Sequence, residues 1–217
     1  MRYSERITTM QSSPIRKLAH IASSAKAKGI KIYHLNIGQP DIKTPKVFFE
    51  AVKNFNNEVL EYAVSPGLPE LISSLQQYYT TYNMDFESDE ILVTNGGSDA
   101  LLFALMATCD PKDNILVPEP FYSNYNGFSQ SINVNITPIT TKAEEGFHLP
   151  SKEKIQSLIT SKTKAILISN PGNPTGTVYT KKELYMISEI AKENDLWIIS
   201  DEVYREFVYD GLEYTSF

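Results

Sequence analysis

The sequence predicts an α/β fold of three layers, in which helices cover both faces of a mostly parallel sheet. From Glu90 onward, short apolar runs alternate with helical stretches, and this β-α-β order is typical of parallel sheets. Runs such as residues 165–168 and 196–199 are apolar at every position. Strands that are buried on both faces have this composition, because neither face meets water.

The first part of the chain predicts helices joined by loops. Ser13 and Pro14 suit the cap and first turn of a helix that ends at Gly29. A short strand at residues 32–37 follows, and further helices are predicted at residues 45–55 and 69–82.

The second part supplies the sheet. Predicted strands and helices alternate along it, the strands at residues 91–94, 115–117, 134–139, 165–168 and 196–199, and the helices at residues 98–108, 122–131, 152–160 and 181–194.

Composition narrows the class of protein. The 217 residues carry 20 basic and 26 acidic side chains, a net charge of −6, which gives no reason to expect nucleic-acid binding. The single Cys109 excludes an intrachain disulfide framework and suits a reducing compartment. The first residues lack a signal-peptide stretch, and the longest apolar run, residues 100–107, is too short to span a bilayer. We therefore expect a cytoplasmic protein with no membrane, nucleic-acid or metal site.

Gly96 and Gly97 join the first predicted strand of this series to a helix that begins near Ser98 and Asp99. Glycines let a ligand approach the backbone closely, and the free N–H groups of a helix start favour an anion such as a phosphate. A plain turn with a helix cap is the commoner meaning of this pattern. An acid in the first turn fits both interpretations, because it suits the helix dipole.

Polar and aromatic side chains follow three other predicted strands. Asn173 lies in a loop that two prolines and two glycines stiffen, residues 170–176. Asp201 ends the last strand, with Tyr204 three residues on, and Tyr122 follows an earlier strand. Because ligands bind at the carboxyl ends of parallel strands, these groups could surround a flat heterocycle. Asp201 could equally cap a helix, and Tyr122 could simply pack between layers.

Six motifs in order carry a family resemblance. From about Ser12 to Phe217 the chain resembles the N-terminal part of class I/II aminotransferases, which are fold-type-I enzymes using pyridoxal 5′-phosphate. The motifs are Gly38-x-Pro40-Asp41, Tyr62 with Gly67-x-Pro69-Glu70-Leu71, Gly96-Gly97-Ser98-x-Ala100-Leu101, Pro120-x-Tyr122-x-x-Tyr125, Asn170-Pro171-x-Asn173-Pro174-Thr175-Gly176 and Asp201-Glu202-x-Tyr204.

The resemblance implies cofactor contacts. It implies that Gly97, Ser98 and Asp99 hold the cofactor phosphate, largely through backbone N–H groups. It also implies that Tyr122 stacks on the pyridine ring and that Asp201 faces the ring nitrogen.

The resemblance further implies that Asn173 and Tyr204 contact the 3-oxygen of the ring, with Asn173 and Gly38 on the substrate side. Family active sites form at a dimer interface, so Tyr62 is expected to reach the phosphate of a neighbouring subunit in a homodimer. Residues 1–44 then correspond to an N-terminal arm, helix and strand of a small domain, and residues 45–217 to an incomplete large cofactor-binding domain.

The resemblance also implies an absence. Family members place the lysine that forms a Schiff base with the cofactor further along, so we expect no catalytic residue in these 217 residues and no appreciable turnover from them alone. For the parent protein we expect transfer of an amino group between an amino acid and a 2-oxo acid in amino acid metabolism, with aspartate favoured by its frequency in the family.

Three alternatives remain open. The same fold and cofactor serve carbon–sulfur lyases and decarboxylases. The second alternative is a non-catalytic fragment that binds the cofactor. A transcription regulator with a DNA-binding head is a third, which the few residues before the first motif helix disfavour.

Overall fold

A computed structural model describes residues 1–10, 17–35, 38 and 40–217. The chain forms two compact units, one of Met1–Ser13 with Asn95–Phe217 and one of Pro14–Thr94. We call the first the sheet unit and the second the helical unit, and each is described by itself.

The sheet unit contains four parallel strands in the order β2-β1-β3-β4. The strands are β1 (Asn114–Glu119), β2 (Asn135–Thr140), β3 (Thr163–Ser169) and β4 (Trp197–Asp201). They cover the predicted runs at residues 115–117, 134–139, 165–168 and 196–199, apart from one or two end residues. Because all pairs are parallel, every strand ends at the same edge of the sheet, where Glu119, Ser169 and Asp201 lie.

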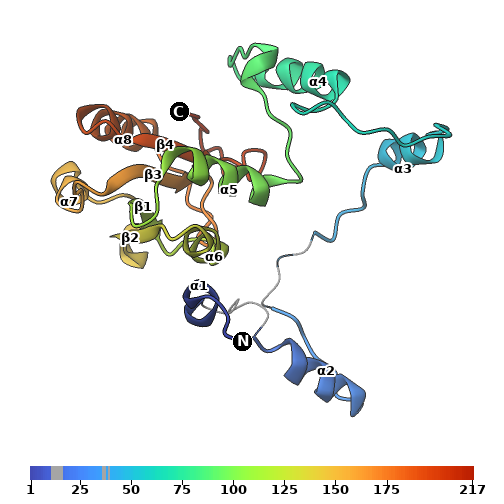
Figure 1. The fold of residues 1–217 in the computed structure, drawn as a ribbon, viewed down its shortest axis with the longest axis horizontal. Coiled ribbons are helices and arrows are strands. Elements are labelled where there is room, and N and C mark those ends of the chain that lie inside the picture. The colour runs from blue at the N-terminus through green and yellow to red at the C-terminus, as the bar shows by residue number, and fades with distance from the viewer. Residues whose placement is uncertain (11–16, 36–37, 39) are drawn as a thin grey trace. The chain divides into compact units, whose positions relative to one another are not determined.

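Helices cover both faces of this sheet, so the predicted fold class is confirmed (Figure 1). One face packs against α5 (Gly97–Thr108) and α6 (Asn124–Ser131), and the other against α7 (Lys152–Gln156) and α8 (Lys181–Glu193). A short helix, α1 (Glu5–Thr9), and the 3₁₀ turns η1 (Ser88–Glu90) and η2 (Ala143–Glu145) were not predicted.

β3 shows why an uninterrupted apolar run folds as a central strand. Ile166 and Leu167 are both fully buried, yet Ile166 belongs to the cluster under α7 and α8 while Leu167 belongs to the cluster under α5 and α6. Successive side chains of a strand point to opposite faces, so each needs an apolar layer of its own. Burying a side chain of this size contributes about 1.5–3 kcal/mol, which makes β3 the centre of both cores.

The helical unit contains α2 (Ala19–Ala27), α3 (Lys46–Lys53) and α4 (Pro69–Thr80). α3 and α4 confirm the predicted helices at residues 45–55 and 69–82. The predicted cap and first turn of the first helix, Ser13 and Pro14, lie outside the described residues.

Two predicted strands are absent from the residues that the structure describes. Residues 91–94 and 32–35 form no strand, whereas residues 36 and 37 lie outside the description. A strand needs a hydrogen-bonded neighbouring strand, and none of the described strands pairs with residues 91–94. Val93 N–H instead donates to Pro66 O at 2.8 Å. Gly67 lies beneath it with φ +123°, and an added Cβ would meet Cγ2 of Val93 at 2.5 Å. This close approach explains why the motif Gly67-x-Pro69-Glu70-Leu71 begins with glycine.

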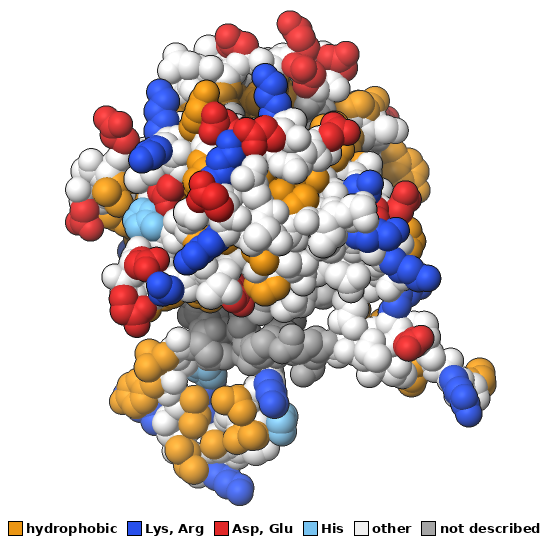
Figure 2. Space-filling view, turned by 90° about the vertical axis from the view of Figure 1, so that its left-hand side faces the viewer, with side chains coloured by type: hydrophobic (Ala, Val, Ile, Leu, Met, Phe, Trp, Pro, Cys, Tyr) orange, Lys and Arg blue, Asp and Glu red, His pale blue; other side chains and the backbone are white. Residues whose placement is uncertain are grey.

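The surface carries charges of both signs. On the face that Figure 2 shows, acidic and basic side chains are interspersed rather than gathered by sign. Along the described part of the chain, no helix combines the length and the apolar character needed to cross a membrane.

Candidate functional site

Asp201 is held at the carboxyl edge of the sheet from three directions. Its Oδ2 accepts a hydrogen bond of 2.6 Å from the hydroxyl of Tyr125 on α6. Its Oδ1 accepts one of 3.3 Å from the backbone N–H of Val203. The carbonyl of Asp201 accepts from the N–H of Asn170 at 3.0 Å, which ties the end of β4 to the loop after β3. The carboxylate is therefore fixed in position, although it remains partly exposed.

Asn173 and Tyr204 come from different loops and line the same depression. This depression has a volume of about 330 Å³ and lies between the loop after β3 and the segment after β4. Its lining residues are Pro171, Gly172, Asn173, Pro174, Gly176, Tyr204, Phe207 and Tyr209. The structure thus brings together the amide and the phenol to which the resemblance assigns one ring oxygen.

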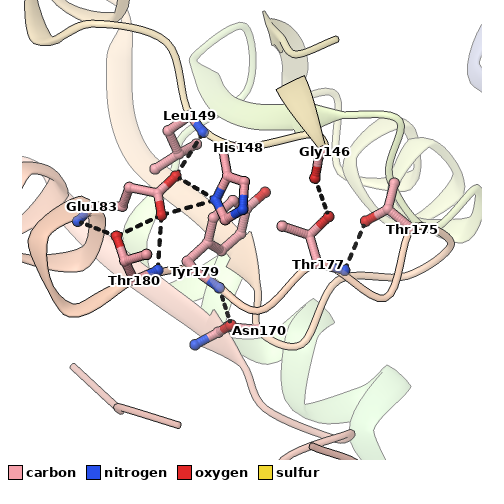
Figure 3. Close-up of polar contacts among 9 residues, drawn as sticks. All are labelled: Gly146, His148, Leu149, Asn170, Thr175, Thr177, Tyr179, Thr180 and Glu183. Carbon is pink, nitrogen blue, oxygen red and sulfur yellow. Dashed lines mark hydrogen bonds and ion pairs between the residues drawn. The ribbon is translucent and has the colours of Figure 1, made fainter. Parts of the chain in front are cut away.

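The loop that carries Asn173 is anchored from behind by buried polar groups (Figure 3). Asn170 is 1% exposed, and its Oδ1 accepts a hydrogen bond of 3.0 Å from the N–H of Tyr179. Thr177 donates its hydroxyl to the carbonyl of Gly146 at 2.9 Å. Since the two anchors lie on either side of Asn173, the loop has little freedom to move its amide.

The same network continues into the start of α8 through Glu183 (Figure 3). Its carboxylate accepts from the backbone N–H groups of Thr180 and Leu149, each at 2.8 Å, and lies 3.1 Å from Nδ1 of His148. Burial acts to raise the pKa of Glu183, but hydrogen bonds from Thr180, Leu149 and His148 outweigh it and lower the pKa. Glu183 is therefore a structural carboxylate that caps a helix and fastens the neighbouring segment.

Tyr122 and Tyr125 meet edge to face after β1. Their ring centroids are 5.5 Å apart at an angle of 88°. Tyr122 is half-buried, and its hydroxyl accepts a hydrogen bond of 2.6 Å from Nδ2 of Asn124. Its ring is thus held at both ends, which suits a side chain that has to present a flat face to a ligand.

The N-terminus of α5 offers free backbone donors. Gly96 caps the helix with φ +87°, a conformation that favours glycine. The first hydrogen bond of the helix runs from Ala100 N–H to Gly96 O at 3.3 Å. Helical geometry leaves the N–H groups of Gly97, Ser98 and Asp99 without a partner inside the helix, so they form a donor set for an anion.

The end of α5 lies close to the start of β4. Met106 and Cys109, at the end of α5, share a depression with Asp195 and Trp197, at the start of β4. A helix of this length spans about 18 Å and a five-residue strand about 17 Å. From these two lengths we infer that the start of α5 lies toward the carboxyl end of β4.

Gly38 and Tyr62 belong to the helical unit, whereas the residues described above belong to the sheet unit. Each is exposed, and the side chain of Tyr62 is fully exposed. Their predicted roles stay predictions.

Two features of the site were missed in the sequence. Tyr125 was quoted only as part of a motif, although its spacing from Tyr122 puts both on one side of the helix start. Glu202 and Arg205 form a buried ion pair directly after Asp201, and their i,i+3 spacing was the available signal.

Burial, the charge of Asp201 and the hydrogen bond to Asp201 raise the pKa of Tyr125 far above its ordinary value, so the phenol stays a donor.

The donor set fits pyridoxal 5′-phosphate, the cofactor that the resemblance implies. Each carboxylate oxygen of Asp201 accepts one hydrogen bond from the protein, and a carboxylate has about four acceptor positions, which leaves room for a ring N–H⁺. A phenol and an amide suit a ring oxygen, and a helix start suits a phosphate.

Comparison with known proteins agrees with this chemistry. A family model described as aminotransferase class I and II matches residues 30–217. A probable aspartate aminotransferase of Methanocaldococcus jannaschii is 35% identical over 98% of this chain and 55% of its own length. The aspartate aminotransferase of Thermotoga maritima matches with a TM-score of 0.91 at 34% identity, over 99% of this chain and 57% of that chain. An alanine aminotransferase of Pyrococcus furiosus matches with a TM-score of 0.89 at 35% identity, over 99% and 55%. The chain thus spans about half the length of these relatives.

Proposed function

The chain belongs to the class I and II aminotransferase family, and we propose that the protein containing it transfers an amino group between an amino acid and a 2-oxo acid. The proposed cofactor is pyridoxal 5′-phosphate. The observation that best supports the proposal is that the carboxylate of Asp201, at the carboxyl edge of the sheet, accepts a 2.6 Å hydrogen bond from buried Tyr125.

In this proposal each side chain has one task. Asp201 would pair with the ring nitrogen and hold a proton on it, because a nearby carboxylate favours the charged form. Asn173 and Tyr204 would donate hydrogen bonds to the ring oxygen. Tyr122 would lie against one face of the ring and exclude water from it. When bound, the cofactor supplies an electron sink for the electrons of the substrate Cα–H bond.

The phosphate would bind at the start of α5. Gly97, Ser98 and Asp99 would donate their backbone N–H groups, and the helix dipole favours the negative charge there. The carboxylate of Asp99 would contribute through the orientation of the first turn rather than through its charge, since two anions repel each other.

The rest of the site would come from the helical unit and a second subunit. We propose that Gly38 lines the substrate side and that Tyr62, which is fully exposed, reaches the phosphate of the partner in a homodimer. Residues 1–44 would belong to the small domain and residues 45–217 to the cofactor-binding domain. A cytoplasmic location suits the single Cys109.

Turnover would need a lysine, because a free amine is the proton carrier expected for this chemistry. Within the described residues, no lysine lines the depression formed by Asn173 and Tyr204. We therefore propose that the 217 residues alone have no appreciable turnover, and that activity belongs to a gene product that also supplies the lysine.

The reaction class is tested by product analysis of the gene product that contains this chain, saturated with pyridoxal phosphate. With aspartate and 2-oxoglutarate, the expected products are glutamate and the matching 2-oxo acid. The panel should include other amino acids, and ammonia, thiol and CO₂ should be measured in parallel. Release of any of these at the rate of substrate loss would point to a lyase or a decarboxylase of the same fold and contradict the proposal.

A further inference from the structure

We propose that Tyr125 is a positioning residue that fixes both Asp201 and Tyr122 for the cofactor, an assignment that rests on the proposed function. Tyr125 belongs to α6, whereas Asp201 lies 76 positions further along the chain. The side chain of Tyr125 is 1% exposed, so it does not line an open surface. It acts on the site through the two side chains that it contacts.

The hydrogen bond sets the orientation of the carboxylate. The Tyr125 hydroxyl donates to Oδ2 of Asp201 at 2.6 Å, a length typical of a strong bond to an ionised acceptor. The other oxygen has only a longer contact, 3.3 Å from the N–H of Val203. Without the phenol, the carboxylate would lose its main restraint against rotation toward solvent.

The ring of Tyr125 supports the stacking residue. It lies parallel to Phe121 with centroids 6.1 Å apart, and edge to face with Tyr122 at 5.5 Å. Tyr125 also belongs to the buried cluster under α5 and α6. Replacing Tyr125 with Phe removes the hydroxyl and leaves these ring contacts in place. The two roles can therefore be separated by experiment.

Tyr179 provides a matched control. It is also buried, at 5% exposure, but belongs to the cluster on the opposite face of the sheet. Burial and the charge of Glu183 raise the pKa of Tyr179 as well. Tyr179→Phe therefore removes a buried phenol hydroxyl that feels the charge of Glu183, and it keeps the backbone N–H that donates to Asn170.

The test measures binding of two probes to the apo form of the gene product. One probe is pyridoxal phosphate, and the other is its 1-deaza analogue, in which C–H replaces the ring nitrogen. We expect Tyr125→Phe to weaken binding of pyridoxal phosphate about tenfold, the scale of a lost hydrogen bond to a charged group, and to leave binding of the analogue unchanged. Tyr179→Phe should change neither affinity.

Other outcomes overturn the inference. Equal losses for both probes in Tyr125→Phe would mean that the phenol only supports the fold, and unchanged affinity for both would mean that it does not position Asp201. If Tyr179→Phe weakened binding of pyridoxal phosphate as much as Tyr125→Phe, the inference would also be overturned. If the unaltered protein bound neither probe, the cofactor site itself would be wrong, which separates that failure from failure of the positioning role alone.

Discussion

Replacing Asp201 with Asn lowers turnover of the gene product by about 10²–10³-fold, the usual cost of removing one preorganised electrostatic partner. Asn has nearly the same shape, so the loss would arise from charge rather than from packing. The amide oxygen can still accept from Tyr125, but a neutral amide no longer favours a protonated ring nitrogen. Steady-state kinetics with the substrates of the product assay measure the loss.

Glu119 provides the control for Asp201. It ends β1, which β3 separates from β4, at the same sheet edge, and its Oε1 accepts a hydrogen bond of 2.8 Å from Thr140. Glu119→Gln makes the same chemical change outside the proposed site and should leave turnover unchanged. Equal activity of Asp201→Asn and the unaltered protein, with equal melting temperatures, would remove the role given to Asp201.

Replacing Glu202 with Ala lowers the free energy of unfolding by about 3–5 kcal/mol, the cost of leaving a buried charge without its partner. Glu202 forms an ion pair with Arg205, and their side chains are only 11% and 8% exposed. Ser200 and Ser216 donate hydrogen bonds to Oε1 of Glu202 at 2.8 and 2.5 Å. Denaturant unfolding followed by the fluorescence of Trp197, on β4, measures the change.

The exposed pair of Lys142 and Glu145, at 57% and 55% exposure, supplies the control. Because water screens such a pair, Glu145→Ala should leave the unfolding midpoint in place. Equal midpoints for Glu202→Ala and the unaltered protein would show that the buried pair does not stabilise the fold.

The effect of Glu202 has a defined pH dependence. Burial acts to raise the pKa of Glu202, but hydrogen bonds from Ser216, Arg205 and Ser200 outweigh it, so the folded pKa lies below the ordinary value of 4.5. A lowered carboxyl pKa stabilises the fold above the unfolded value, and this contribution is lost as the pH falls through the folded pKa. The difference between Glu202→Ala and the unaltered protein should therefore be full at pH values well above 4.5 and shrink below it.

Strand prediction succeeded for the runs that pair within the sheet. Ile166 and Leu167 each require an apolar layer, and the sheet supplies one on either face. Residues 91–94 have the same composition and form no strand, because backbone pairing depends on a neighbour that composition cannot reveal. Local pattern thus predicted the four strands of the sheet and their order in the chain, whereas the predicted strands at residues 32–35 and 91–94 did not form.

The site divides in a similar way. Motif order predicted that Asn173 and Tyr204 belong together, and they line one depression. The contact of Tyr125 with Asp201 joins residues 76 positions apart, so spacing could not reveal it. The predicted roles of Gly38 and Tyr62 depend on how the two units and a second subunit meet. Neither the local sequence pattern nor the structure of each unit by itself gives that arrangement.

A crystal structure of the gene product grown with pyridoxal phosphate tests the central claim most directly. We predict phosphate oxygens within hydrogen-bond distance of the backbone N–H groups at the start of α5, and the ring nitrogen about 3 Å from a carboxylate oxygen of Asp201. A phosphate bound away from α5, or a ring nitrogen that faces away from Asp201, would contradict the account.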